Sequence, residues 1–277
     1  MKKKNYMFVL IISIALEIYA LPYYLGKEFI HTDEYVKICI DSNAIKFDNL
    51  LEKGRLFQKK EFDYFEGDKN LYIFLDCIVS NTYFLTVIKK DSRSDFDYSC
   101  WEMTYKERLK DTIYNASKLI PFTLISAESF ITEKDKSGKE IKFLPEKSDF
   151  FSLGSNPWAV KADASKVINV STKRWRHPTM KYYPISDIVF VNGFVYPDKL
   201  YLYEQNSRAK RVKISYADTS FEAELKDTGN FQVVHLPAAI DPKTDNDIRL
   251  EILDYYPGTK YSDVVISGLY YMDALVK

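Results

Sequence analysis

The sequence predicts a mainly β protein in which a small α+β domain precedes a β-sandwich, and three observations predict this class. Among 277 residues, Tyr occurs 22 times and Phe 18 times, while Gly occurs only nine times. Aromatic side chains favour pleated, half-buried surfaces. Short apolar or alternating segments, separated by turn residues, recur at the spacing of a sandwich or barrel. One stretch, residues 105–119, has the periodicity of an amphipathic helix.

The first twenty residues have the layout of a secretory signal. Residues 2–4 are lysines, an apolar run follows from Tyr6 to Leu16, and the small residue Ala20 closes the segment. The run is short for a membrane span, and Glu17 interrupts it. We therefore expect residues 1–20 to be a signal peptide and the protein to be exported, to the periplasm or beyond the cell. No stable membrane span is expected after cleavage, and uncleaved anchoring is the alternative.

Residues 21–120 are expected to form the small α+β domain. Apolar segments predict strands at residues 35–40, 71–78 and 83–89. The second of these begins with a continuous apolar run, which is typical of a buried strand. Residues 43–56 have a mixed, helix-like spacing.

The helix of this domain is predicted over residues 105–119. Charged residues are interleaved there with Leu109, Ile113, Ala116 and Leu119, which follow one another at three- and four-residue steps. Pro121 stops the helix because it has no backbone N–H and its ring obstructs the preceding turn. We therefore place the domain boundary near residue 120.

Residues 121–277 read as an all-β domain. An apolar strand, 122–125, follows Pro121, and residues 134–140 form a charged loop with Gly138 at its turn. Later segments alternate in the way that half-buried strands do. The strands are expected at residues 185–191, 199–202, 211–216, 220–224, 231–236, 247–253 and 263–271. No linker separates this domain from the first, so we expect the two to pack together.

Charge and cysteine usage exclude several classes of protein. The 39 basic residues balance 39 acidic ones, so no nucleic-acid partner is expected. Cys39, Cys77 and Cys100 all lie in the N-terminal domain, and their spacing fits no zinc pattern. In an oxidising compartment one pair of them is able to form a disulfide.

No catalytic pattern is present in the sequence. It contains no H-E-x-x-H, no G-x-S-x-G and no phosphate-binding glycine loop. His235 lies within an apolar strand, where a hydrogen-bonded sheet histidine is expected. We therefore predict that the protein is not an enzyme and has no catalytic residues and no cofactor.

Two tryptophan-containing segments are the candidate ligand-binding residues. Trp158 follows Asn-Pro, which marks a loop. Trp175, Arg176 and His177 lie in a basic, aromatic cluster that suits an acidic glycan. Aromatic faces stack on sugar rings, and Arg donates paired hydrogen bonds to hydroxyls or carboxylates. The alternatives are packing over a core edge for Trp158 and a solvated hairpin tip for the cluster.

A second group of residues has the character of structural motifs. Asn192 and Gly193 form a tight-turn signal, because Gly tolerates positive φ and Asn nearly so. Asn206 and Arg208 lie at the start of a strand, and Arg208 is expected to form a paired salt bridge with either Asp227 or Asp263, with contact to a ligand as the alternative.

The turn near residue 258 raises the question of a metal. Its carboxylates, Asp254 and Asp263, together with backbone oxygens near Tyr256 and Gly258, are able to hold calcium. No dense D-x-D-x-D loop is present. We therefore predict no metal, with calcium as the alternative.

These motifs, in this order, resemble a known family. The phrases are Val-Asn-Gly-Phe at 191–194, Asn-Ser-Arg-Ala-Lys at 206–210, Leu-Lys-Asp-Thr at 225–228, Tyr-Pro-Gly-Thr-Lys-Tyr-Ser-Asp at 256–263 and Val-Ile-Ser at 265–267. Their order and spacing are similar to those of the NADase-type glycan-binding domain. This is a discoidin-like member of the galactose-binding-domain superfamily. The resemblance runs from about Phe122 onward and is dense over the last 90 or so residues.

The resemblance implies an eight-stranded antiparallel jelly-roll sandwich. It also implies glycan binding by loops at one end, without chemistry by the domain itself. The chain departs from the family in two places: the acidic, glycine-rich stretch after Trp158 is missing, and Gly268 stands where the family has Glu. These departures put the ligand in doubt rather than the fold.

Three hypotheses for function follow from the sequence. The first is an exported, non-enzymatic protein that recognises glycan through loops at one end of the sandwich. The second is a structural or assembly module of the bacterial envelope that binds a protein. The third makes the N-terminal domain a small hydrolase that the sandwich targets to its substrate.

Overall fold

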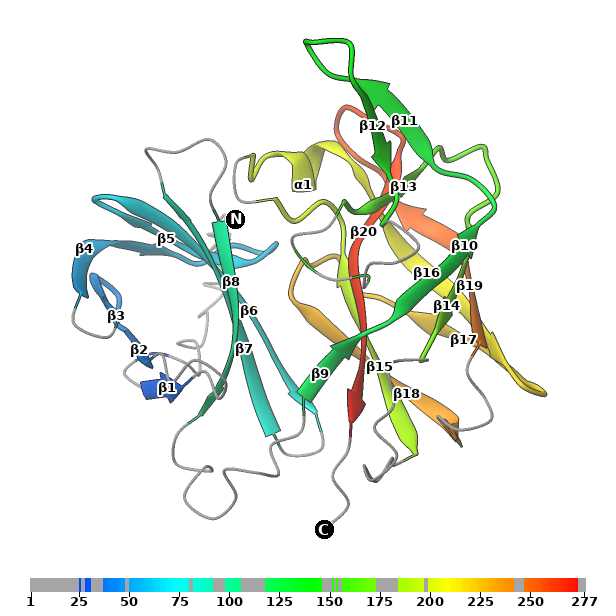
Figure 1. Ribbon diagram of the computed structural model, residues 1–277, viewed down its shortest axis with the longest axis horizontal. Coiled ribbons are helices and arrows are strands. Elements are labelled where there is room, and N and C mark those ends of the chain that lie inside the picture. Colours follow the sequence, from blue (N-terminus) through cyan, green and yellow to red (C-terminus); the bar gives the residue numbers. More distant parts are fainter. Residues whose placement is uncertain are drawn as a thin grey trace, which may run out of the picture.

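The protein consists of two β domains that lie side by side (Figure 1). The computed structural model describes residues 25, 28–30, 37–47, 50–79, 82–91, 98–105, 118–145, 151, 153, 156–172, 184–196, 199–241 and 247–273. Among these residues, no helix is long and apolar enough to cross a membrane. The predicted signal peptide, residues 1–20, lies outside the described residues.

The N-terminal domain is a closed barrel of eight strands, each paired with its neighbour in the chain, and β8 closes the barrel against β1. Its strands are β1 (Glu28–Ile30), β2 (Lys37–Ile40), β3 (Ala44–Phe47), β4 (Leu50–Phe57), β5 (Asp63–Gly67), β6 (Asn70–Val79), β7 (Thr82–Asp91) and β8 (Tyr98–Tyr105). The core contains Ile38, Phe65, Tyr72 and Phe74, all nearly or fully buried. The interior is therefore filled by apolar and aromatic side chains.

One carboxylate, that of Glu52 in β4, is buried in this barrel. It accepts hydrogen bonds from the backbone N–H of Lys69 (2.8 Å), the backbone N–H and side-chain amide of Asn70 (both 2.6 Å) and the Tyr72 hydroxyl (2.7 Å). Burial raises the pKa of Glu52, but these hydrogen bonds lower it more, so the net pKa lies below its usual value. The carboxylate thus fixes the β5–β6 turn.

The C-terminal domain is a β-sandwich in one continuous, ten-stranded sheet. Its strands are β9 (Lys118–Pro121), β10 (Thr123–Ala127), β13 (Trp158–Val160), β14 (Val167–Ser171), β15 (Ile185–Asn192), β16 (Ser207–Tyr216), β17 (Thr219–Glu224), β18 (Phe231–Ile240), β19 (Asp247–Tyr256) and β20 (Val264–Asp273). One layer has the order β10-β14-β19-β16-β17, and the other contains β18, β15 and β20 with β9 and β13 beside β20. A short parallel pairing of β16 with β20 joins the layers.

The strand pattern explains how this sandwich packs on both sides. Along β15, Ile188 and Phe190 belong to the core between the two layers, which Trp158 also fills. The alternate residues, Val189 and Val191, belong to a second cluster that includes barrel residues. Because successive side chains on a strand point to opposite faces, β15 faces the sandwich core on one side and the barrel on the other.

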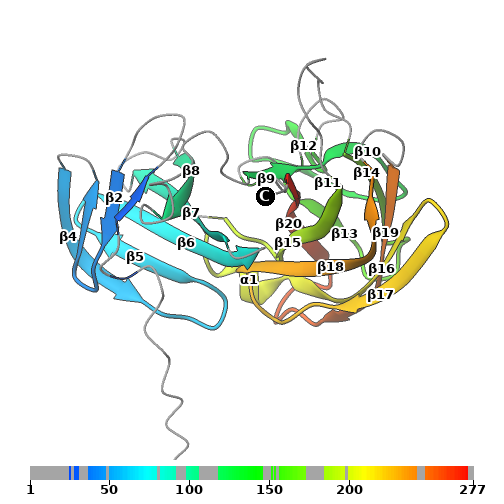
Figure 2. The same ribbon diagram turned by 90° about the horizontal axis from the view of Figure 1, so that it is seen from below.

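The second cluster joins the two domains. It combines Phe62, Ile73, Leu75 and Ile88 of the barrel region with sandwich residues such as Phe231. Strands β6 and β18 approach each other there, as Figure 2 shows from below. The expectation that the domains pack together is therefore confirmed.

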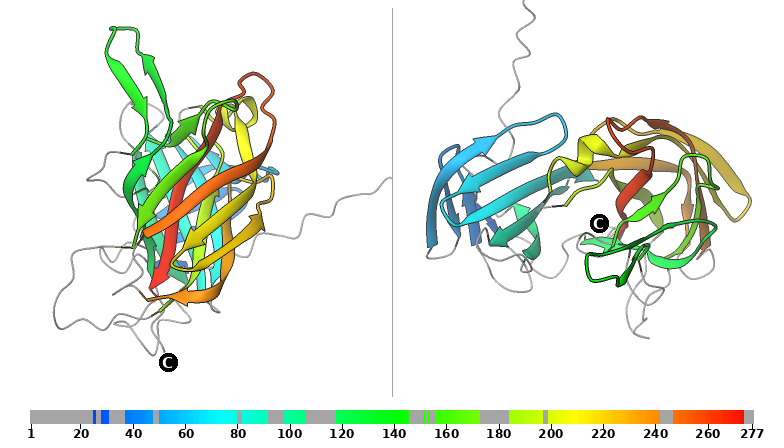
Figure 3. Two further views of the ribbon diagram at one scale, coloured as in Figure 1. Left: turned by 90° about the vertical axis from the view of Figure 1, so that its right-hand side faces the viewer. Right: turned by 90° about the horizontal axis from the view of Figure 1, so that it is seen from above.

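Two smaller elements lie at one end of the sandwich. The hairpin of β11 (Ile131–Lys134) and β12 (Glu140–Phe143) projects beyond the sheets (Figure 3). A one-turn helix, α1 (Leu202–Gln205), precedes β16. These elements frame the candidate site.

The mainly β class predicted from the sequence is confirmed, with corrections in detail. In the described residues the helices and strands of the N-terminal domain are strands only, and of residues 43–56, which have a helix-like spacing, 44–47 form β3 and 50–56 belong to β4. Of the predicted helix over 105–119, Tyr105 ends β8, residues 118–119 begin β9 and the remainder lies outside the described residues. The strand predicted at 199–202 is a turn that leads into α1. The sheet has ten strands rather than the eight that the resemblance implies.

Candidate functional site

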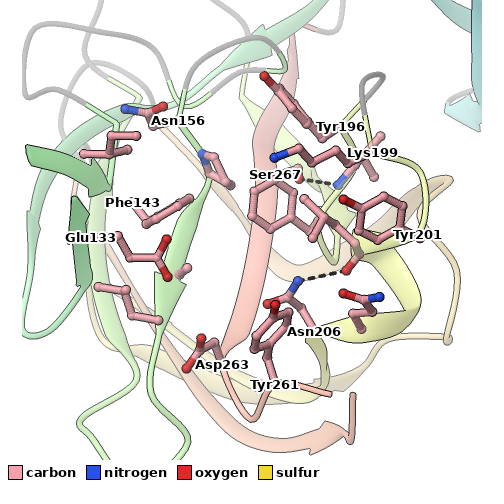
Figure 4. Close-up of a pocket in the computed structure, with 18 of the residues that line it drawn as sticks. Glu133, Phe143, Asn156, Tyr196, Lys199, Tyr201, Asn206, Tyr261, Asp263 and Ser267 are labelled. Carbon is pink, nitrogen blue, oxygen red and sulfur yellow. Dashed lines mark hydrogen bonds between the residues drawn. The ribbon is translucent and has the colours of Figure 1, made fainter. Parts of the chain in front are cut away.

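A cavity of about 580 Å³ lies at the end of the sandwich that carries the β11–β12 hairpin and α1 (Figure 4). One wall comes from the hairpin, through Glu133 and Phe143, and another comes from Tyr201 and Gln205 at α1. Its volume falls within the range of about 300–1,000 Å³ that is usual for small-molecule sites. We call this site the end cavity.

Two tyrosines give the end cavity an exposed aromatic rim. Tyr201 is 54% exposed and Tyr261 is 39% exposed, and both line the cavity. The Lys260 ammonium group lies 4.9 Å from the centre of the Tyr261 ring. An exposed aromatic ring beside a cavity offers a flat, weakly hydrated face on which a ligand ring stacks.

The carboxylate of Asp263 is the polar group best placed to receive a ligand. It lines the end cavity and is half-buried. Burial raises the pKa of Asp263 above its usual value, and the charge of Lys161 offsets this in part. Within the described part of the chain no hydrogen-bond donor to this carboxylate is found. A ligand hydroxyl would supply the missing donor, because a half-desolvated acceptor gains more from such a bond than a solvated one.

The α1 helix and the turn over residues 257–261 form a single unit. The backbone N–H of Thr259 donates to the Glu204 carbonyl (2.9 Å), and that of Tyr261 donates to the Gln205 carbonyl (2.8 Å). A Cβ on Gly258 would lie 2.4 Å from the Gln205 carbonyl oxygen, so only glycine allows this approach. Gly258 therefore has a structural role, and backbone hydrogen bonds connect the segments that carry Tyr201 and Tyr261.

Of the two carboxylates predicted to pair with Arg208, Asp227 is its partner. Arg208 donates from Nε to Oδ1 (2.9 Å) and from Nη2 to Oδ2 (3.0 Å) of Asp227. Its Nη1 donates to the carbonyls of Asn206 (2.9 Å) and Pro257 (3.2 Å). The Arg208 side chain is nearly buried, so its donors hold the ends of β16 and β19 and the loop before β18 together.

The other structural motifs also act within the protein. Asn192 is fully buried, and its amide exchanges hydrogen bonds with the backbone of Ala209, at 2.7 and 2.9 Å. Asn206 donates from its side chain to the Leu202 carbonyl (2.9 Å) and so closes α1. Gly193 has the positive φ that its residue type allows, +78°, but it is a bridge residue paired with Ile266, and the tight turn predicted at 192–193 is not present.

Replacing Gly193 with alanine is expected to lower the free energy of unfolding by about 2 kcal/mol, from left-handed strain and a steric clash. A Cβ at this position would lie 2.5 Å from the Tyr203 ring. Gly138→Ala is the matched control, since Gly138 has φ of +85° with no atom within 4 Å of its Cβ position. Urea denaturation measures both variants. Equal losses would show that the Tyr203 ring moves aside without cost.

The sequence-predicted ligand residues are not gathered at the end cavity. Trp158 is fully buried in the sandwich core, and its indole N–H donates to the Ser129 carbonyl (2.9 Å). It lies in β13 rather than on an open loop, so the expectation that it offers a face to a ligand is wrong. Trp175, Arg176 and His177 lie outside the described residues.

The carboxylates considered for calcium do not act together. Asp254 accepts a hydrogen bond from the Tyr255 N–H (2.9 Å) and lies 3.4 Å from the Lys210 ammonium group, whereas Asp263 faces the end cavity. No group of three His, Cys, Asp or Glu side chains able to hold a metal is found in the described ranges. Cys39 lies in β2, Cys77 in β6 and Cys100 in β8, and because the side chains of Cys77 and Cys100 lie outside the described set, a disulfide stays a prediction.

His235 is the hydrogen-bonded sheet histidine that the sequence predicts, and it lies in β18. Its side chain is 82% exposed, and its Nδ1 contacts the buried carboxylate of Asp187. The Asp187 carboxylate also accepts a hydrogen bond from the Ser186 hydroxyl (2.6 Å). The Ser186 hydroxyl is thus directed at the carboxylate and not at the imidazole, which differs from a nucleophile–base pair.

Sequence reasoning missed most residues of the end cavity. Tyr201 and Gln205 fell in or beside a predicted strand, and Glu133 and Phe143 were not singled out. A usable signal was present for Tyr261, which lies between two predicted strands, 247–253 and 263–271. Among the residues named in advance, Asn206 and Asp263 line the cavity.

The fold and the site together define a two-domain β protein whose C-terminal domain is a β-sandwich with a cavity at one end. Residues 178–272 match the family model described as the NAD glycohydrolase translocation F5/8 type C domain. The match begins before β15 and ends within β20. It confirms, for this segment, the discoidin-like resemblance that the motifs indicate.

The remaining comparisons add little. No curated protein matches the sequence. One solved structure is similar at 8% identity, described as CBM51-2 in complex with GlcNAc and INT domains from Clostridium perfringens ZmpB. The similarity covers 69% of this chain but only 37% of that one, with a TM-score of 0.23. The fold described above rests on its own strand pairing.

Proposed function

We propose that this protein is an exported, non-enzymatic binding protein that recognises a glycan in the end cavity. The observation that carries the proposal is the combination, in one cavity, of the Tyr201 and Tyr261 faces with the Asp263 carboxylate. Sugars present C–H faces that stack on aromatic rings and hydroxyls that need acceptors. Export is part of the proposal and rests on the basic and apolar layout of residues 1–20.

The cavity also has groups that would discriminate between sugars. Asn156 lies on one side of it, and Lys199 lies on the side of Tyr201 (Figure 4). These groups come from separate segments of the chain, as do the two tyrosines. The cavity would therefore select a ligand that contacts both sides by its shape as well as by the positions of its hydroxyl groups.

Glycan-array binding by the chain without residues 1–20 tests this function. We expect retention of at least one glycan, and about a tenfold loss of affinity for that glycan in Tyr201→Ala or Tyr261→Ala, because each removes a stacking face. Asp263→Asn is expected to lower the affinity for the same glycan, since the amide is a poorer hydrogen-bond acceptor than the carboxylate. Titration calorimetry with the retained glycan measures each change.

Two matched controls separate binding from folding. Phe130→Ala removes an aromatic ring that is 40% exposed but does not line the end cavity, and Asp218→Asn changes an exposed carboxylate in the β16–β17 turn. Both should bind as the wild type does. Retention of no glycan by the wild type, or equal affinity of the cavity and control variants, would overturn the proposal.

A second candidate function is binding of a partner protein during its movement to or across the envelope. The observation that favours it is the description of the matched family model, which names translocation of an NAD glycohydrolase. Cross-linking in the native host distinguishes the two candidates. One stoichiometric protein partner whose capture survives Tyr201→Ala would favour translocation, whereas capture of polysaccharide that the variant abolishes would favour glycan binding.

A further inference from the structure

The α1 helix cannot hold its position by itself. It has four residues, and its N-cap residue, Tyr201, makes no side-chain capping hydrogen bond. A helix of this length has too few internal hydrogen bonds to offset the cost of forming its first turn. The wall of the end cavity that α1 provides must therefore be held by contacts with other elements.

The main contact is made by Tyr203, whose side chain points into the protein. Tyr203 is 2% exposed, the Arg208 guanidinium lies 5.4 Å from its ring centre, and Gly193 lies directly beside its ring. Phe62 also packs against Tyr203, and the two rings meet edge to face at 5.8 Å and 89°. Phe62 belongs to the barrel domain, between β4 and β5.

The barrel segment that carries Phe62 is itself bound to the sandwich. The Glu61 carbonyl accepts hydrogen bonds from the Gly229 N–H (2.7 Å) and the Thr228 hydroxyl (2.9 Å). The Lys60 ammonium group lies 3.0 Å from the Asp227 carboxylate. A Cβ on Gly229 would lie 2.9 Å from Phe62 and 3.1 Å from Tyr203, so glycine is needed for this close packing.

We propose that barrel residues Lys60–Phe62 are a positioning element for the end cavity, and that Phe62 acts on it through Tyr203 and α1. Tyr201 and Gln205 stand two residues to either side of Tyr203, and both line the cavity. The ligand-binding wall of the sandwich is thus completed by the other domain. The inference rests on the proposed function for its consequence in binding, but not for the positioning itself.

The effect of Phe62 extends beyond α1. The carbonyls of Glu204 and Gln205 receive the backbone N–H groups of Thr259, Lys260 and Tyr261. A displacement of α1 therefore reaches the second tyrosine of the rim. One barrel side chain controls the spacing of both aromatic faces.

Hydrogen exchange followed by mass spectrometry on Phe62→Leu and Phe62→Ala tests the positioning without any ligand. The amides of Gln205, Asn206, Thr259 and Tyr261 donate to carbonyls of Tyr201, Leu202, Glu204 and Gln205. We expect these four amides to exchange about tenfold faster or more in the variants, because local opening no longer breaks the contact with Phe62. Amides in the middle of β16 and β19 should keep their wild-type rates.

Phe65→Ala is the control for general destabilisation, since Phe65 is a fully buried barrel residue outside the cluster that contains Tyr203. It should leave exchange at α1 unchanged. Faster exchange at α1 in Phe65→Ala as well, or unchanged exchange there in both Phe62 variants, would overturn the inference. Phe62→Leu keeps most of the apolar volume and serves if Phe62→Ala does not fold.

A second measurement separates this inference from the proposed function. The wild type, Phe62→Leu and Tyr201→Ala are applied to the same glycan array. Loss of the retained glycan in both variants supports the positioning role. If the array retains nothing for any protein while exchange at α1 accelerates in Phe62→Leu, the proposed function fails and the positioning stands. Full glycan retention by Phe62→Leu, despite loss in Tyr201→Ala, would overturn the inference.

Discussion

Replacing Asp227 with alanine is expected to lower the free energy of unfolding by about 4 kcal/mol at neutral pH, because the change leaves a buried guanidinium without its counterion. The Arg208 and Asp227 side chains are only 10% and 19% exposed. The same carboxylate also holds Lys60 of the barrel. Urea denaturation at pH 7 measures the loss.

The matched control for this variant is Asp254→Ala. Asp254 pairs with Lys210 at the surface, where the two side chains are 45% and 44% exposed. Exposed ion pairs contribute about 0–1 kcal/mol, so this control should be close to the wild type. Equal losses in the two variants would mean that the Arg208–Asp227 pair is not effectively buried.

The effect of Asp227→Ala is expected to depend on pH. Burial raises the pKa of Asp227, but the hydrogen bonds from Arg208 and Lys60 lower it more, so the net pKa is below its usual value. A carboxyl with a lowered folded-state pKa stabilises the protein above its unfolded-state pKa of about 3.9, and the stabilisation is lost as pH falls through the folded-state value. The difference between wild type and variant should therefore narrow below about pH 4.

Replacing Trp158 with alanine is expected to cost about 4 kcal/mol of stability, since it empties the largest fully buried side chain in the core. It also leaves the Ser129 carbonyl without its indole donor. The melting temperature and the urea midpoint measure the effect. Where the variant remains folded, its glycan affinity should match that of the wild type, because Trp158 does not line the end cavity.

Phe130→Ala is the control for Trp158→Ala, as an aromatic ring removed from the surface. Its effect should stay within about 0.5 kcal/mol. A Trp158→Ala protein of wild-type stability would show that the core closes around the missing ring. A Trp158→Ala protein that folds normally but no longer binds glycan would show that Trp158 contributes to glycan binding.

The sequence predicts the sandwich well because its signals are local. Alternation along residues 211–216 marks β16, and Gly193 marks a positive φ. The sequence predicts two alternative partners for Arg208, Asp227 and Asp263, and in the structure the partner is Asp227. In each case the residue type is dictated by its own segment of backbone, or by a motif with fixed spacing.

Most residues of the end cavity could not be predicted from the sequence, because the cavity is assembled from segments that lie far apart in the chain. Tyr201 and Tyr261 are brought together by backbone hydrogen bonds between α1 and the turn after β19. The prediction for Trp158 was wrong because its local signal was followed too far. Asn-Pro before it indicates a loop, but β13 begins at Trp158 itself, and the indole is buried in the core. Glu52 was not singled out, because its four donors come from residues 17–20 positions away.

The two domains differ in how far apart in the chain their paired strands lie. Each barrel strand pairs with the next one, so nearly all of its contacts are local. The sandwich instead requires β20, which pairs with β9, β13, β15 and β16 before the layers are complete. Local contacts form faster than distant ones. The barrel should thus fold first and present the segment with Phe62 as a preformed surface, on which the slower sandwich assembles its binding wall.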